Sequence, residues 1–277
     1  MLGSMDIIYG QWIARTRSPH TARAYQQSLD KWVAVFGMPP SGDTTEADLV
    51  DFLKSMMHLA QATQATHLRN IKALLRWGHL EGHWQSPPSV LKYRLRSPGS
   101  LASSRFLSPE HARAIIAAAN NERDRLILQC LYSLGLRNAE LRNLEWSDLH
   151  YDRLKVRGKG GKVRSLLVPA DLLEQLQVWR LASSGRGLIF RSHRSGSKLE
   201  GQHVWRVVKQ AVAIARQTDP SIPDASPHWF RHALASAALQ GGATVKQVQV
   251  YLGHASGQTT LDTYAHVIGD VAIADFI

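Results

Sequence analysis

The sequence is poor in cysteine and in long apolar stretches. Its only cysteine, Cys130, lies in the apolar run 126–131, so an internal disulfide is excluded and a reducing compartment is expected. We interpret Cys130 as a small buried hydrophobic residue. No apolar run approaches the roughly 18–20 residues that cross a membrane, and no secretory signal peptide is visible. These features favour a cytoplasmic protein over a secreted or membrane-spanning one.

Acidic residues are scarce relative to basic ones. The chain has 22 Asp and Glu against 33 Lys and Arg, which gives a formal net charge of +11. Such a positive charge predicts a polyanionic partner, either a nucleic acid or an acidic membrane surface. No predicted amphipathic helix combines a Lys-rich face with an exposed aromatic face, and this weighs against the membrane surface.

Residues 5–85 are predicted to form a helical domain. Ser18 and Pro19 are typical of the cap and first turn of a helix that Gly37 ends. Two further helices are expected, from Thr44 or Thr45 to about residue 57 and from about 64 to 77. The first of the three helices shows apolar residues at helical spacing: Tyr25, Leu29, Trp32, Val33 and Phe36.

The third of these helices carries a row of basic side chains on the side opposite its apolar face. The row consists of Arg69, Lys72 and Arg76, spaced i, i+3 and i+7. It is either an ordinary solvated face or a surface that follows DNA phosphates. The net positive charge of the chain favours the second interpretation.

Residues 86–106 are predicted to form a basic linker. Ser-Pro and Pro-Gly pairs favour extended and turn conformations, and no acidic residue occurs from Gln85 to Pro109. Three basic residues alternate along it: Lys92, Arg94 and Arg96. The segment is either a strap along a DNA backbone or an ordinary solvated linker.

Residues 107–277 are predicted to form a second domain of mixed structure. Helices are expected at about 107–119, 122–134, 138–144, 170–181, 204–217, 228–239, 244–252 and 259–267. Two strands, 153–157 and 162–168, interrupt the helical period around a glycine turn, and the apolar run 188–190 is a candidate third strand. The predicted fold is therefore mainly α with a small antiparallel β-sheet, a helical domain followed by an α+β domain.

Four short segments of the second domain carry reactive side chains. They are Gly-Leu-Arg-Asn-Ala-Glu-Leu at 135–141, Gly-Lys-Gly-Gly-Lys at 158–162, His-Trp-Phe-Arg-His at 228–232, and Leu-Gly-His at 252–254 followed by Tyr264. Each alone is a weak signal. Together they supply two guanidinium groups, two imidazoles, an ammonium and a phenol, a set suited to attack on a phosphodiester.

Each side chain has a plausible role in that attack. Arg137 and Arg231 can bind the non-bridging oxygens as permanently charged forks. Tyr264 can form a covalent phosphotyrosyl intermediate, but its usual pKa of ~10 demands a base, for which His228 is a candidate. Three further side chains can assist: Lys159 by protonating the leaving 5′ oxygen, His254 by hydrogen bonding to the phosphate, and Glu140 by holding Arg137 or His228 in place.

These segments resemble the tyrosine recombinases, also called the phage integrase family. All six active-site positions of the family pattern have a match: Arg137, Lys159, His228, Arg231, His254 and Tyr264. The resemblance covers about residues 107–270, and residues 5–85 are similar in layout to the family's helical core-binding domain. It implies a prokaryotic, DNA-associated enzyme that clamps double-stranded DNA, assembles as a tetramer in the synapse and leaves a 3′-phosphotyrosine, with no metal or other cofactor.

Two features depart from the longer members of the family. We expect a compact Xer-like layout without an arm-binding domain ahead of residue 5, and the segment given after Tyr264 is short. That segment is rich in apolar residues, so we expect it to dock on a protein surface, either its own domain or that of a neighbouring protomer.

Several alternatives stay open on sequence alone. A DNA-binding protein that no longer cuts, or a relaxing enzyme similar to topoisomerase IB, would share most of these residues. Lys162 is an alternative to Lys159. His228 and His232 have the i, i+4 spacing of some zinc helices, but the carboxylate that such helices carry after the first histidine is missing.

Overall fold

The computed structural model describes residues 2–16, 18–84, 89–95, 107–158, 161–183, 185–192 and 194–253. Internal contacts divide the chain into two compact units, residues 1–99 and 100–277. The division falls inside the segment 86–106 that was predicted to be a linker. Each unit has its own hydrophobic core, and each is described here by itself.

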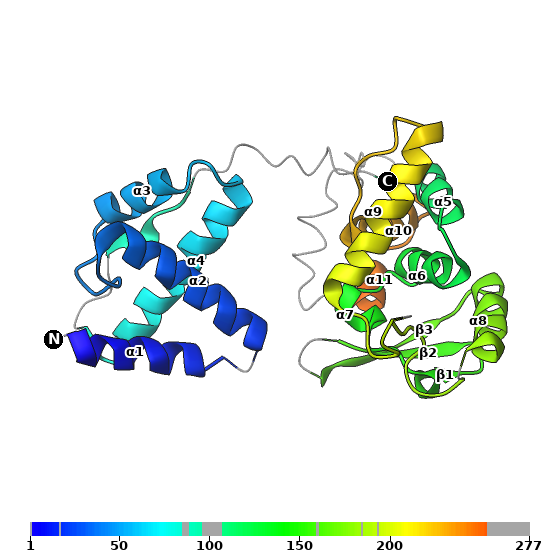
Figure 1. Cartoon of the computed structure of the whole chain (residues 1–277), viewed down its shortest axis with the longest axis horizontal. Coiled ribbons are helices and arrows are strands. Elements are labelled where there is room, and N and C mark those ends of the chain that lie inside the picture. The colour runs from blue at the N-terminus through cyan, green and yellow to red at the C-terminus, as the bar shows by residue number, and fades with distance from the viewer. Residues whose placement is uncertain are drawn as a thin grey trace, which may run out of the picture. The chain divides into compact units, whose positions relative to one another are not determined.

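The first unit is helical throughout its described residues. Its helices are α1 (Leu2–Ala14), α2 (Pro19–Phe36), α3 (Glu46–Ser55) and α4 (Gln61–Leu80), followed by the short 3-10 helix η1 (Ser89–Lys92). Ser18 caps α2 by accepting a hydrogen bond from Thr21 N, and Gly37 ends the helix with a φ of 68°. Figure 1 shows α2 and α4 packed against each other, with α1 and α3 on either side.

Two parts of this unit were not predicted. Helix α1 buries Tyr9 and Trp12, and Trp12 stacks on Tyr25 with ring centroids 4.0 Å apart. Residues 89–95 were expected in the linker, but Val90 is fully buried in the core of the first unit. The helical unit therefore extends past residue 85, where the basic, proline-containing segment begins.

The second unit combines a helical bundle with one small sheet. Its helices are α5 (Pro109–Ala117), α6 (Glu122–Ser133), α7 (Asn138–Leu141), α8 (Ala170–Ala182), α9 (Gly201–Thr218), α10 (Pro227–Gln240) and α11 (Val245–Leu252), with a 3-10 turn η3 (Trp146–Asp148). Helix α6 packs against α5, α8, α9 and α10. Figure 1 shows the sheet at one end of this bundle, beside α8. Among the described residues the fold is mainly α with one antiparallel sheet, as predicted.

The sheet consists of β1 (Leu149–His150), β2 (Arg153–Arg157) and β3 (Val163–Leu167), in the order β1-β2-β3. Leu154 and Val156 of β2 and Leu166 of β3 are buried in the core, whereas alternate residues of β2 face solvent. The candidate third strand at 188–190 was wrong. Leu188 forms only an isolated bridge to Glu145, and the third strand is β1.

None of the helices in the described part of the chain is both long enough and apolar enough to cross a membrane. Cys130 is buried in the core of the second unit, and burial raises the pKa of its thiol to about 12. A thiol with so high a pKa stays protonated and unreactive near neutral pH.

Candidate active site

A tight turn between α6 and α7 places Arg137 at the start of α7. Gly135 has a positive φ of 57°, and a Cβ atom there would lie 2.8 Å from side-chain carbons of both Leu234 and Leu252. Any larger residue would clash, so glycine lets the chain reverse close to α10 and α11. Arg137 follows as the N-cap residue of α7.

The carboxylate of Glu140 binds both the backbone and the side chain of Arg137. The carboxylate accepts hydrogen bonds from Arg137 N at 2.9 Å and from Arg137 Nη1 at 2.8 Å. It also accepts two bonds of 2.9 Å from the guanidinium of Arg164. Of the two partners considered from the sequence, Glu140 contacts Arg137; none of its hydrogen bonds within the described residues reaches His228.

These bonds keep Glu140 ionised although it is only 4% exposed. Burial raises the pKa of its carboxyl, but the hydrogen bonds from Arg164 and Arg137 outweigh burial and lower the pKa from 4.5 to about 2. Glu140 is therefore an anion at neutral pH, flanked by two arginines.

Arg231 lies one turn after His228 on α10 and is almost completely buried. Its side chain is 1% exposed. Its Nη1 donates to Gly135 O at 2.6 Å and its Nη2 to Leu252 O at 2.5 Å. The guanidinium thus lies at the C-terminal end of α11, where the helix dipole stabilises a positive charge.

The two arginines meet at the end of α11. Arg137 donates to Leu252 O at 3.4 Å and to Gly253 O at 3.1 Å. With the bond to Glu140, these contacts engage three of the five N–H hydrogens of the Arg137 guanidinium. Its side chain stays 34% exposed, so Arg137 can offer the remaining hydrogens to an anion.

His228 is solvent-accessible at the first turn of α10. The pKa of its imidazole is lowered from 6.5 by partial desolvation and by the positive charges of Arg231 and Arg137. The ring is therefore neutral at pH 7 and can accept a proton. The rings of His228 and His232 meet edge to face with centroids 4.5 Å apart, and the described residues include no group of three or more possible metal ligands.

Lys159, His254 and Tyr264 lie outside the described residues, but the residues directly before two of them are described. Gly158 precedes Lys159 at the end of β2, and its N–H donates to Lys162 O at 2.7 Å across the turn. Gly253 precedes His254 and ends α11 with a φ of 65°. The side chain of Lys162 is exposed.

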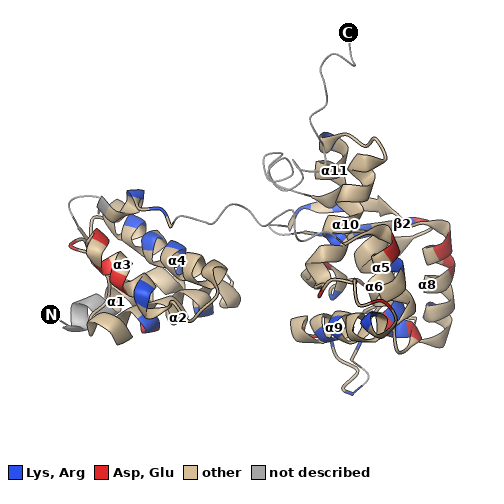
Figure 2. Ribbon diagram, turned by 90° about the horizontal axis from the view of Figure 1, so that it is seen from above, with Lys and Arg blue, Asp and Glu red and all other residues tan. Residues whose placement is uncertain are grey.

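Five of the six basic residues predicted to bind DNA lie in the described part of the first unit. Arg69, Arg76, Lys92 and Arg94 are exposed, whereas Arg96 lies outside the described residues. Lys72 donates to Tyr93 O at 2.6 Å, and its pKa is lowered by burial and by the charges of Arg76 and Arg94. The row on α4 and the stretch around residue 93 therefore form one surface, and Figure 2 shows Lys and Arg along α4.

Arg164 belongs to this site and was missed in the sequence. The alternation of β3 places Val163, Ser165 and Leu167 on the exposed face, so Arg164 and Leu166 fall on the inner face. An arginine on the inner face of a strand needs a buried anion as its partner. That was the available signal, and Glu140 is the anion.

The geometry of the site can be compared with known proteins. The family model described as the phage integrase family matches residues 105–269, which is more than half of the chain. The chain belongs to the phage integrase family. All six predicted catalytic residues, from Arg137 to Tyr264, fall within the part that matches this integrase family.

Individual integrase-family members agree with this. Tyrosine recombinase XerC of Pelobacter propionicus is 33% identical over 276 residues, covering 91% of this chain and 86% of the relative. The XerH site-specific recombinase, in a post-cleavage complex with palindromic difH substrate, has a TM-score of 0.75 at 20% identity and covers 95% of this chain and 81% of that chain. A lambda integrase tetramer bound to a Holliday junction has a TM-score of 0.73 at 20% identity, covering 92% and 78%. Both structures share the fold.

Proposed function

We propose that this chain is a site-specific DNA recombinase that cleaves and rejoins DNA strands through a covalent bond to Tyr264. The phenol oxygen attacks the phosphorus, the bond to the 5′ oxygen breaks, and a 3′-phosphotyrosine and a free 5′-hydroxyl result. Rejoining is the reverse reaction with the 5′-hydroxyl of another strand, so the energy of the phosphodiester bond is retained in the phosphotyrosine.

The convergence of Arg137 and Arg231 on the end of α11 is the observation that carries this proposal. Both donate to Leu252 O, directly ahead of Gly253 and His254. Two permanent cations beside one another suit the negative charge that the non-bridging oxygens gain in the transition state. Arg137 presents its positive charge to solvent, whereas the buried Arg231 adds to the positive potential from behind.

Proton transfer is assigned to His228 and Lys159. His228 is neutral near pH 7, because desolvation and both arginines lower its pKa, and it takes the proton of Tyr264. Lys159, on the turn between β2 and β3, gives a proton to the leaving 5′ oxygen. His254 donates a hydrogen bond to the phosphate. It directly follows the backbone segment to which both arginines are anchored.

Double-stranded DNA is the proposed substrate and partner. The net charge of +11 supports it, as do the DNA complexes of the XerH and lambda recombinases that share the fold. Assembly of several copies on DNA is proposed from the lambda integrase tetramer on a Holliday junction. The proposed place of action is the prokaryotic cytoplasm, and the similarity to tyrosine recombinase XerC of Pelobacter propionicus supports it.

The test is a covalent trapping assay. The parent protein and Tyr264→Phe are incubated with nicked suicide DNA and separated on a denaturing gel. We expect an adduct from the parent and none from Tyr264→Phe, with similar DNA affinity because the phenol oxygen adds little contact area. An adduct of undiminished yield from the Phe variant contradicts the assignment. Failure of the parent to form any adduct on a cognate site would indicate a binding protein that does not cut.

A further inference from the structure

We propose that Arg164 is a positioning residue for strand cleavage. It holds Glu140 against Arg137 and lies close beside the glycines that directly precede Lys159 and His254. The inference rests on the proposed function, because it concerns residues that the proposed reaction uses.

The first contact of Arg164 is with Glu140. Its Nη1 and Nη2 each donate to a different carboxylate oxygen at 2.9 Å, so the pair is bidentate. The side chain of Arg164 is 13% exposed and that of Glu140 is 4% exposed. A planar fork on both oxygens fixes the plane of the carboxylate, which a single point charge cannot do.

The orientation of that carboxylate determines where Arg137 lies. One Glu140 oxygen accepts from Arg137 Nη1 and the other from Arg137 N. Each oxygen thus serves one donor of Arg137 and one of Arg164. If Arg164 is lost, the carboxylate is free to rotate, and the guanidinium of Arg137 moves with it.

The second contact concerns the turn that carries Lys159. Arg164 pairs with Val156 in the β2–β3 ladder, and Gly158 follows two residues later. A Cβ atom on Gly158 would lie 3.7 Å from Glu140 Oε1 and 4.0 Å from Arg164 Nη1. A side chain at the position directly before Lys159 would therefore touch the ion pair, and the glycine backbone lies close beside it.

The third contact concerns the segment that leads to His254. A Cβ atom on Gly253 would lie 3.2 Å from Arg164 Nη1 and 3.4 Å from Arg164 Cδ. The backbone here passes so close to Arg164 that a side chain would need the arginine to shift. Gly253 O is also the acceptor of Arg137 Nη2 at 3.1 Å. Arg164 thus lies beside the two glycines that directly precede Lys159 and His254, and it acts on Arg137 through Glu140.

The test compares Arg164→Lys and Arg164→Gln with a matched control, Arg157→Lys. Arg157 lies on the same hairpin and pairs with Asp148 at 3.1 Å, but its side chain is 65% exposed. For each protein we would measure the cleavage rate of nicked DNA, the Kd for a half-site and the melting temperature. Cleavage is measured on an ordinary phosphate and on a 5′-bridging phosphorothiolate, whose thiolate leaves without a proton.

Arg164→Lys is expected to slow cleavage of ordinary DNA by on the order of 10²-fold, similar to the loss of one preorganised donor, with the half-site Kd nearly unchanged. The phosphorothiolate should restore at least about tenfold of this loss, because it bypasses the displaced Lys159. Arg164→Gln should behave similarly with a larger loss, and Arg157→Lys should cleave within about twofold of the parent. A purely structural residue would not show selective rescue by the leaving group.

Three results would overturn the proposal. Arg164→Lys could cleave within about threefold of the parent, the phosphorothiolate could rescue nothing, or neither variant could fold at the assay temperature, which would make Arg164 a stability residue. Lys159→Ala, run alongside, separates these failures from failure of the proposed function. If the phosphorothiolate rescues Lys159→Ala but the Arg164 variants are unimpaired, only the inference about Arg164 fails.

Discussion

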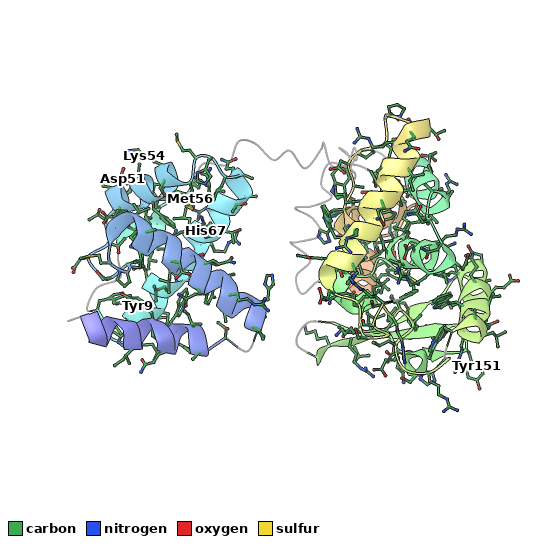
Figure 3. All side chains as sticks on the ribbon, viewed as in Figure 1. Tyr9, Asp51, Lys54, Met56, His67 and Tyr151 are labelled. Carbon is green, nitrogen blue, oxygen red and sulfur yellow. The ribbon has the colours of Figure 1, made fainter. Side chains whose placement is uncertain are left out.

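Each unit of the molecule buries a polar network, and the two networks differ in charge. In the first unit, Ser28 Oγ lies 2.9 Å from His67 Nδ1 and accepts from Asn70 Nδ2 at 3.0 Å, which links α2 to α4. Figure 3 labels His67 on this unit. In the second unit, Glu140 and two arginines link α7, β3 and the end of α11.

The neutral network holds two helices together at low electrostatic cost. Ser28, His67 and Asn70 are at most 9% exposed. The pKa of His67 is lowered by burial and by the charge of Lys31, so the ring is uncharged at neutral pH. Such a network satisfies buried hydrogen-bonding groups and specifies how α2 and α4 pair.

The charged network does more than join elements. It keeps Arg137 partly exposed and aimed beside Arg231, although an ion pair buried as deeply as this has a large desolvation cost. The comparison indicates that the first unit buries polar groups for packing, whereas the second buries charge to preorganise a site for an anion.

Glu140→Gln should give the largest change. Removing the anion leaves Arg164 buried without a counter-charge, and breaking a buried pair typically costs about 3–5 kcal/mol of unfolding free energy. We expect the lower end of this range, because Arg137 is 34% exposed. Urea denaturation at pH 7 would measure it, with the exposed Glu122→Gln as the control.

The pH dependence of that variant has a definite sign. Because the folded pKa of Glu140 is lowered from 4.5 to about 2, its contribution to stability is complete above pH 4.5 and is lost as the pH falls toward 2. The difference between parent and variant should therefore be smaller at pH 4 than at pH 7. A difference that stays constant would contradict an ionised Glu140.

Arg137→Lys and Arg231→Lys should each retain charge but lose cleavage. At Arg137 an ammonium cannot reproduce the fork of donors, and loss of one donor to a developing oxyanion costs on the order of 10²–10³ in rate. At Arg231 an ammonium cannot bridge Gly135 O and Leu252 O, so we expect the end of α11, to which Arg137 also donates, to shift. Single-turnover cleavage of suicide DNA at saturating protein would measure this. Rates within about threefold of the parent for both variants would show that charge alone is sufficient at this site.

Asn70→Ala should reduce stability without affecting chemistry. It removes the donor to Ser28 Oγ at 3.0 Å and to Ala24 O at 3.2 Å, and one lost buried partner costs about 1–3 kcal/mol. Cleavage at saturating protein should match the parent. The exposed Gln26→Ala, which removes only a bond to Asp30, is the control. A slower chemical step in Asn70→Ala would break the proposed contrast between the two networks.

Neutralising Arg69, Arg76 and Arg94 together should have the smallest effect for each residue. If the three contact phosphates, the slope of log K against log salt should become shallower by about 0.9 for each lost contact. The equilibrium affinity for a half-site, measured at several salt concentrations, gives the slope. An unchanged slope would assign this surface to solvent and would leave Lys72 in a structural role through its bond to Tyr93 O.

Local structure was predictable where a few neighbouring residues determine it. Ser18 with Pro19 begins a helix as predicted, because a cap and a proline act within one turn, and Ser108 with Pro109 begins α5 in the same way. The β2–β3 hairpin was predictable because the helical spacing of apolar residues is interrupted on both sides of a glycine turn. Helix α1 and strand β1 were missed, because one is defined by packing of Tyr9 and Trp12 and the other by pairing with β2.

The candidate site divides in the same way. Arg137, Glu140, His228 and Arg231 were singled out from their chemical types and their order, and the structure brings their segments together. Lys159, His254 and Tyr264 stay predictions, since they lie outside the described residues. The pairing of Glu140 with Arg137 is a local contact between residues three apart at the start of α7, whereas its pairing with Arg164 joins residues 24 apart and has no local pattern.

The sequence by itself determined the kind of chemistry, because residue type fixes which functional groups are available: guanidinium, imidazole, ammonium and phenol. Their pKa values depend on where the chain places them. The tertiary structure alone decided that Arg164 joins the site. Its role depends on which face of β3 turns inward and on a carboxylate 24 residues away in the sequence. Contacts across such separations arise only when the two elements pack, and burial then turns two ordinary charged residues into a bidentate ion pair.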